Sequence, residues 1–551
     1  MPPKSPLKIF ACWGQGQKRG RVFEGLLGAA AALGFAPFYL APITLIALAL
    51  LGVRLYYLHT ASALPVKSRF KSGFKTGWFF GFGLFLVGLY WIGSAFTMRP
   101  GGYIYLMVPM VGGLIAGLSL FWGVAAGLAV RGARLSLWGF SLKLFSWLFL
   151  AELARGHLLG GLPWNLPGYI IEAGHPLSQI SSLIGIYGQS LIVLLFAASL
   201  TIICAADRSR PIIISLAVSL IALAGMWTYG QLRLPAADAD TYADVKLRLV
   251  MVDFSQRDQF DPQKNTAIVR EFIRQSVSPG FEDVTHVIWP EGAVGGLALG
   301  NEGFLRAVGQ SFLKADPDSP PSWILNSLRH EQRRSLNGQP QDLYYNTMGQ
   351  VAFDKLGHPR VLGFNDKTRL VPFGEFIPYA SQLEKFGLGT LSAALSSMTP
   401  GAQKTSFSIS GLPEVNSLIC YEGIFPDVSR NITGAPKWIL NLSNDGWYGR
   451  GSGPYQHANQ TRYRAIETGL PLVRASAGGE SGVYDSYGRV IKFSPSHATR
   501  VLDVKLPNQR LQTHKLFQNV WFMLLISLII LVIAKIWGCL LYTSPSPRDR
   551  G

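Results

Sequence analysis

The sequence is poor in charged residues and in cysteine. Only 15% of its 551 residues are charged and 49% are apolar, which excludes an ordinary soluble protein. Its four cysteines are Cys12, Cys204, Cys420 and Cys539, and only Cys420 lies in the long, more polar segment at 231–515. A disulfide within that segment is therefore excluded, and Cys420 is either a small buried hydrophobe or a reactive thiol.

Patterns for metal and nucleic-acid binding are also missing. No His and Cys residues stand at zinc-ligand spacing, so neither a metal nor another cofactor is expected. The net charge of +18 forms no basic stripe with interleaved aromatic residues, so nucleic acid is not an expected partner. The Lys and Arg residues stand instead in short gaps between apolar runs, where cytoplasmic loops of membrane proteins carry them.

Eight apolar runs are long enough to cross about 30 Å of hydrocarbon. They are residues 23–40, 41–57, 78–96, 103–130, 135–153, 180–205, 212–230 and 517–537. With the basic residues 1–22 in the cytoplasm, alternation predicts a seven-span membrane domain at 23–230 and places 231–515 outside. An eighth helix at 516–537 returns the chain to a cytoplasmic tail, 538–551, whose final residues resemble a sequencing scar.

The outer segment contains short β-branched or apolar runs that alternate with helical stretches. The strands are expected at 246–254, 284–289, 323–328, 344–353, 416–420, 438–442, 472–476 and 483–491, and the helices at 263–278 and 457–469. This alternation predicts an α/β domain rather than an all-β sandwich.

Three residues beside these runs are candidate catalytic residues. Cys420 ends a strand before a turn, where it would be exposed at the sheet edge and helix amides would lower its pKa; the alternative is an inert buried cysteine. Glu291 follows a buried strand, where desolvation would raise its pKa and suit proton exchange; the alternative is a solvated loop glutamate. Lys367 precedes a rigid, Pro-rich segment and could stabilise developing negative charge; the alternative is a surface lysine.

Together these residues lie in four blocks that resemble the nitrilase, or carbon–nitrogen hydrolase, superfamily. The blocks are WPEGA at 289–293, NDKTRLVPFGEFIP at 365–378, LICYEGIFPD at 418–427 and NLSNDGWYG at 441–449. Inside a domain flanked by spans, they resemble the apolipoprotein N-acyltransferase family over nearly the whole chain. The resemblance implies an α-helical multi-span membrane domain plus an α/β nitrilase-like outer domain, an αββα sandwich. Three mild departures are Gly292, Gly446 and Phe260, where the family commonly has serine, alanine and tryptophan.

The resemblance also implies roles for individual residues. Cys420 falls on the nucleophile of a Glu-Lys-Cys triad, Glu291 on its base and Lys367 on its oxyanion partner. The supporting or substrate-binding positions are Glu375, Tyr421, Glu422 and Trp447. By contrast, Asp445 is expected to shape a turn, His457 to start a helix, and the span-end residues Glu152, Arg155 and His157 to form an interfacial polar cluster.

The implied reaction moves an acyl chain from a membrane phospholipid to the amino-terminal α-amine of a diacylglyceryl-cysteine on an apolipoprotein. It would proceed by ping-pong chemistry through a Cys420 thioester, in the bacterial inner membrane with a periplasmic catalytic domain. The alternative is a membrane-anchored nitrilase-type amidase that hydrolyses a carbon–nitrogen bond. A transporter is disfavoured because only Lys143 is charged near the middle of a span and no repeated pair of broken helices is seen.

A thioester must be kept from water, and two segments are candidate lids. Residues 292–300 are Gly-rich and apolar, and residues 379–400 carry apolar side chains with few charges. The second segment is expected to dip toward the bilayer and admit acyl chains; the alternative is an ordinary packed helix.

Overall fold

The structure is a computed structural model that describes residues 18–60, 65–98, 104–235, 240–334, 338–377, 398–508, 511, 513 and 516–540. The chain divides into two compact units. The helical unit comprises Met1–Phe96, Tyr103–Leu234 and His514–Gly551, and the sheet unit comprises Thr97–Gly102 and Pro235–Thr513. The expected lid at 379–400 lies outside the described residues except for its last three, as does the tail from 541 onward.

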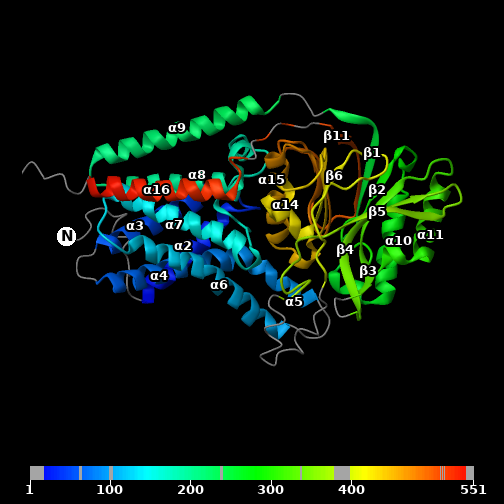
Figure 1. The fold of residues 1–551 in the computed structure, drawn as a ribbon, viewed down its shortest axis with the longest axis horizontal. Coiled ribbons are helices and arrows are strands. Elements are labelled where there is room, and N and C mark those ends of the chain that lie inside the picture. Colours follow the sequence, from blue (N-terminus) through cyan, green and yellow to red (C-terminus); the bar gives the residue numbers. More distant parts are fainter. Residues whose placement is uncertain are drawn as a thin grey trace, which may run out of the picture. The chain divides into compact units, whose positions relative to one another are not determined.

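Long apolar helices make up the helical unit (Figure 1). They are α2 (Lys18–Ala31), α3 (Ala41–Thr60), α4 (Val66–Leu89), α6 (Ile104–Val130), α7 (Leu137–His157), α8 (Ser181–Ala205), α9 (Ser209–Arg233) and α16 (Val520–Leu540), with the short α5 (Ser94–Met98) after α4. Within the described residues, six helical stretches are long and apolar enough to cross a membrane. The chain is therefore a membrane protein.

The ends of the helical unit differ from the expected spans. Helix α2 has 14 residues, which rise only about 21 Å, and a 3-10 turn at Ala32–Gly34 follows it, so the expected run 23–40 is not one helix. Near the other end, α16 meets the apolar criterion over the shorter stretch Val520–Ile536. The number of spans remains a prediction.

Among the described residues, two buried ion pairs lie inside the helical unit. Arg54 donates to Glu24 at 2.8 Å, and both side chains are almost fully buried. Arg155 pairs with Glu152, which also accepts a 2.7 Å hydrogen bond from the indole of Trp122. Glu152 and Arg155 are each 1% exposed, so they form a buried pair rather than the expected interfacial cluster. Such pairing is what burial of charge in an apolar unit requires.

Two sheets form the centre of the sheet unit. The six-stranded sheet has the order β11 (Arg500–Pro507), β1 (Thr241–Met251), β2 (His286–Ile288), β3 (Ser322–Arg334), β4 (Pro340–Phe353), β5 (Pro359–Asp366). The five-stranded sheet has the order β10 (Val490–Ser494), β9 (Ser481–Tyr484), β8 (Leu472–Ala477), β7 (Trp438–Asn444), β6 (Val415–Ile419). Strands β1, β2 and β3 run parallel, as do β6, β7 and β8.

Helices cover the outer faces of both sheets (Figure 1). Helices α10 (Pro262–Ser276) and α11 (Glu302–Ala315) pack Phe272 and Phe312 on the six-stranded sheet. Helix α15 (Gly453–Thr468), beside the short α14 (Pro426–Arg430), packs Ala465 on the five-stranded sheet. Between the sheets, residues such as Ile324 and Leu440 share one apolar core. These four layers confirm the predicted αββα sandwich.

Candidate active site

Cys420 stands at the sharp turn that follows strand β6. It opens the 3-10 helix η9 (Cys420–Ile424) with a φ of 47°. A residue with a Cβ is strained in this left-handed region by about 1–3 kcal/mol, and such strain concentrates at functional sites. The predicted strand-to-helix turn is confirmed. The predicted exposure is wrong, because Cys420 is only 7% exposed and joins the core between the sheets.

Two carboxylates share one lysine beside this turn. Lys367 Nζ lies 2.8 Å from Glu375 Oε1 and 3.9 Å from Glu291 Oε1. Asn346 Nδ2 donates to both carboxylates, at 2.8 Å to Glu291 and 2.9 Å to Glu375. The Cys420 thiol is hydrogen-bonded to Glu291. Four of the seven expected site residues therefore meet in one cluster: Glu291, Lys367 and Cys420 follow strands of the two sheets, and Glu375 comes from the loop after Lys367.

Burial controls the protonation of this cluster. It raises the pKa of Glu291, and the Lys367 ammonium partly offsets that rise. It also raises the pKa of Cys420 to about 12, with a further contribution from the negative charge of Glu291. For Lys367, burial acts to lower the pKa, but the charges of Glu375 and Glu291 raise it overall. The resting site thus holds a neutral thiol facing Glu291. The prediction that helix amides lower the pKa of Cys420 is therefore wrong.

Glu422 connects the lysine segment to the cysteine turn. Its carboxylate accepts hydrogen bonds from Thr368 N at 2.8 Å, Ile419 N at 2.9 Å and Lys404 Nζ at 2.7 Å. Burial acts to raise the pKa of Glu422, but the Lys404 charge and these donors lower it overall. Glu422 is therefore a fully buried anion that holds the neighbours of Lys367 and Cys420 together.

The two expected aromatic residues, Tyr421 and Trp447, each pack against another aromatic ring. Tyr421 is mostly buried and meets Phe425 edge to face, with ring centroids 4.9 Å apart. Trp447 meets Phe260 edge to face at 6.4 Å. Each residue therefore makes an edge-to-face contact with another aromatic ring near the site.

Sequence reasoning missed several groups that touch Cys420. Tyr448 is hydrogen-bonded to the Cys420 thiol, and burial raises the pKa of its phenol well above the ordinary value. His457 meets the Cys420 carbonyl oxygen at 3.2 Å through Nε2 and Asp445 at 2.8 Å through Nδ1. Arg474 completes the network with an ion pair to Asp445 at 2.5 Å. Asp445 is thus a buried anion behind the nucleophile, and more than the turn-forming residue that was expected.

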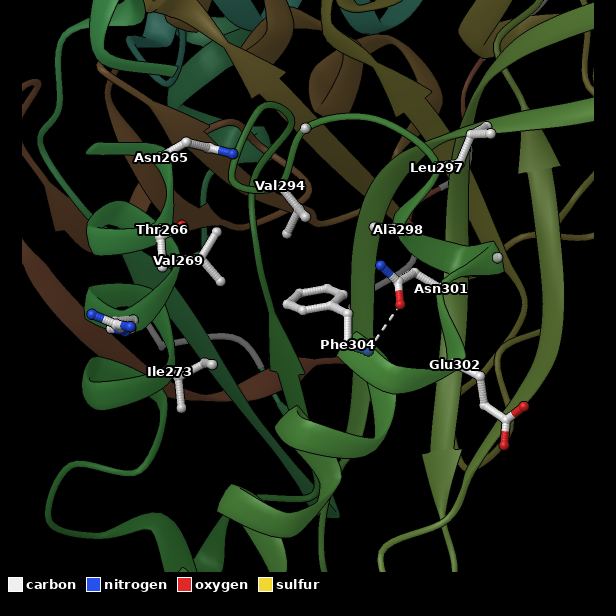
Figure 2. A pocket seen from close by; sticks show the side chains of 13 residues that line it. Asn265, Thr266, Val269, Ile273, Val294, Leu297, Ala298, Asn301, Glu302 and Phe304 are labelled. Atoms are coloured by element: carbon white, nitrogen blue, oxygen red, sulfur yellow. Dashed lines mark hydrogen bonds between the residues drawn. The ribbon is translucent and has the colours of Figure 1, made fainter. Parts of the chain in front are cut away.

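An open groove of about 710 Å³ lies on the outer helical layer, between α10 and the loop that precedes α11. Figure 2 shows Val269 and Ile273 of α10 on one side and Val294 and Phe304 on the other. The groove includes much of the expected lid 292–300 but neither Glu291, Lys367 nor Cys420. It is therefore separate from the charged cluster.

The chain was compared with known families and proteins. Residues 27–199 match the family described as "Apolipoprotein N-acyltransferase N-terminal domain", and residues 255–515 match "Carbon-nitrogen hydrolase". Among solved structures, a carbon-nitrogen hydrolase from Helicobacter pylori G27 is 16% identical, with a TM-score of 0.32, covering 51% of this chain and 94% of that one. An amidase from Nesterenkonia sp. is 17% identical, with a TM-score of 0.31, covering 50% and 94%.

Curated relatives match over nearly the full length. A protein of Rhodopseudomonas palustris named "Apolipoprotein N-acyltransferase" is 34% identical, and the match covers 91% of each chain. A protein of Caulobacter vibrioides with the same name is 32% identical, over 95% of this chain and 96% of the relative. With this identity sustained across both units, the chain belongs to the apolipoprotein N-acyltransferase family.

Proposed function

We propose that this chain transfers an acyl group from a membrane phospholipid to the amino-terminal α-amine of a diacylglyceryl-cysteine on an apolipoprotein, through a thioester on Cys420. One observation carries the proposal: a buried thiol, hydrogen-bonded to Glu291, stands at a strained turn beside the Lys367 ammonium. A neutral nucleophile next to a desolvated base is the arrangement that general-base activation requires.

The first half-reaction loads the enzyme. Glu291 takes the thiol proton as Cys420 Sγ attacks the ester carbonyl carbon of the phospholipid. The Lys367 ammonium, held in place by Glu375, stabilises the oxyanion that develops on the carbonyl oxygen. The carbon–oxygen ester bond then breaks, Glu291 returns the proton to the leaving alkoxide, and a lysophospholipid departs.

The second half-reaction forms the amide. The neutral α-amine of the lipid-modified cysteine attacks the thioester carbonyl carbon, and Glu291 accepts a proton from the nitrogen. The carbon–sulfur bond breaks, and the proton passes from Glu291 to the sulfur. The products are an N-acylated lipoprotein and the original thiol, so no redox partner is needed.

The proposed location and partners follow from the distribution of basic residues and from the proposed reaction. The basic loops between the apolar runs support a cytoplasmic side, and on that ground we infer that the sheet unit lies in the periplasm at a bacterial inner membrane. The phospholipid of that membrane is then the acyl donor, and diacylglyceryl-modified apolipoproteins are the acceptors. The names of the relatives and the membrane-length helices favour transfer to an amine over the alternative of a membrane-anchored amidase.

Cys420→Ala tests the proposal in membranes that contain the full chain. We expect this variant to abolish amino-terminal acylation of a lipoprotein, measured by mass spectrometry of its modified cysteine. Cys204→Ala is the matched control, because Cys204 is a free cysteine of helix α8. A phospholipid-derived acyl group should also be found on Cys420 when no acceptor is present. Unchanged acylation in Cys420→Ala membranes would overturn the proposal, and release of free fatty acid alone would support the amidase.

A further inference from the structure

One short turn contacts both the loop that holds Glu291 and the end of strand β7, which lies beside the strand that leads to Cys420. This turn is the 3-10 helix η6 (Gln256–Phe260), which lies between β1 and α10. Gln259 donates from Nε2 to the carbonyl oxygen of Gly292, the residue after the base. Gln256, at the start of the same turn, is hydrogen-bonded to Asn444, the last residue of β7. The turn therefore connects two loops that belong to different sheets.

Gln256 and Asn444 form a reciprocal amide pair. Gln256 Nε2 donates to Asn444 Oδ1 at 2.8 Å, and Asn444 Nδ2 donates to Gln256 Oε1 at 3.0 Å. The two residues are 2% and 4% exposed. In such a dry environment a buried amide that loses its partner is costly, so the pair fixes the positions of both side chains.

Two glycines make room for this pair. A Cβ on Gly446 would lie 2.4 Å from Gln256 Nε2, and a Cβ on Gly292 would lie 2.2 Å from Asn444 Nδ2. Gly292 also has a φ of 79°, which disfavours any other residue there. These glycines are two of the three positions where the chain departs from the common family pattern. In this chain the amide pair occupies the volume that a side chain would take.

The amide pair bears on the nucleophile through Asn444. The backbone N–H of Asn444 is hydrogen-bonded to the sulfur of Cys420. A donor aimed at the sulfur stabilises the thiolate over the thiol. Holding Asn444 in place therefore sets how readily Cys420 gives up its proton, while Gln259 and Gly292 hold the loop of the base at the same time.

We propose that Gln256 is a positioning residue, which holds Asn444 so that its backbone N–H stays against the Cys420 sulfur. It acts on the reaction only through Asn444 and touches none of the reacting atoms. The expected change in the acylation rate of Cys420 rests on the proposed function. The expected change in the reactivity of the Cys420 thiol does not, because it can be measured without a lipid substrate.

The test compares Gln256→Ala and Gln256→Glu with the control Gln275→Ala, all in the full-length chain in membranes. Gln275 lies on α10, and its amide contacts only Glu271 of the same helix among the described contacts. The first readout is the rate of alkylation of Cys420 by iodoacetamide as a function of pH, followed by mass spectrometry. The second is single-turnover acylation of Cys420 from phospholipid, separated from the KM for that lipid.

Loss of one hydrogen bond to a developing charge corresponds to roughly tenfold in rate. We therefore expect Gln256→Ala to slow alkylation about tenfold at each pH below the thiol pKa, and to slow acylation similarly with KM unchanged. Gln256→Glu keeps the acceptor oxygen that Asn444 Nδ2 uses, so it should retain an intermediate rate. Gln275→Ala should match the unmodified chain.

Wild-type alkylation rates in Gln256→Ala would overturn this proposal, whatever Cys420→Ala does to lipoprotein acylation. If Gln256→Ala does not fold, Gly446→Ala replaces it, because the added Cβ displaces the Gln256 amide without removing it. The same loss of thiol reactivity is then expected, and unchanged reactivity would again overturn the proposal.

Discussion

Replacing Glu291 by glutamine should make the Cys420 thiol more acidic and at the same time a poorer acyl acceptor. The thiol pKa is about 12 because the sulfur is buried and because Glu291 repels the thiolate. Glutamine keeps the shape of the side chain but removes that repulsion. Two unit charges 4 Å apart repel by about 4 kcal/mol near a protein surface, and one pKa unit corresponds to about 1.4 kcal/mol. Relief of a third of this repulsion would give roughly ten times more thiolate at a fixed pH.

Acyl transfer should change in the opposite direction. Without its general base, loading of Cys420 from phospholipid should fall by about 10²–10⁴. Both quantities can be measured on one preparation, alkylation of Cys420 at fixed pH and acylation in a single turnover. Glu302→Gln is the matched control, since Glu302 is an exposed glutamate of α11 paired only with Arg306 in the described contacts. If alkylation of Glu291→Gln slows together with acylation, Glu291 does not hold the thiol neutral and the reasoning fails.

Three further outcomes are expected. Lys367→Met should lower the rate of Cys420 acylation by about 10²–10³, the effect of losing one oxyanion donor, in the single-turnover assay. Glu422→Ala should lower the free energy of unfolding by about 3–5 kcal/mol, because it leaves Lys404 buried and uncompensated; the denaturation midpoint measures this, and adding Lys404→Met should recover part of the loss. The pKa of Asp445 is lowered, because the charges of Arg474 and His457 outweigh the effect of burial. The ionised Asp445 therefore stabilises the folded state fully above its unfolded pKa of about 3.9, and this stabilisation is lost as the pH falls through the folded pKa. In Asp445→Asn the melting temperature should therefore be lower near neutral pH and decline less below about pH 4.

Much of the sheet unit could be predicted because its buried strands are uninterrupted apolar runs. Strands β6 and β7 are entirely buried and were expected within two residues of their observed ends. Strand β5 was missed, because it begins at Pro359, lies at a sheet edge and exposes Val361, Leu362 and Phe364 without a period-two pattern. Helix α11 was missed although Leu305, Val308 and Phe312 repeat at helical spacing and are buried.

The cluster of Glu291, Lys367 and Cys420 could be predicted from strand ends together with the motif order. Its protonation could not, since the thiol is kept neutral by burial and by a carboxylate that lies 129 positions earlier in the chain. Asn346 gave a usable signal, as a polar residue within an apolar strand, and it proved to bridge both carboxylates. Tyr448 gave none, because its contact with the sulfur depends on how two turns pack.

The sharing of Lys367 by two carboxylates has a consequence for the lifetime of the acyl-enzyme. Once the lysophospholipid has left, Glu291 and Glu375 face a single ammonium and an uncharged thioester, so the pocket holds two carboxyl groups for one positive charge. Hydroxide is repelled from such a pocket, whereas a protonated amine is drawn toward it and can surrender its proton on arrival. The ratio of amide product to free fatty acid should therefore stay constant as the pH rises. The charge of the pocket would then favour the amine over hydroxide as the nucleophile.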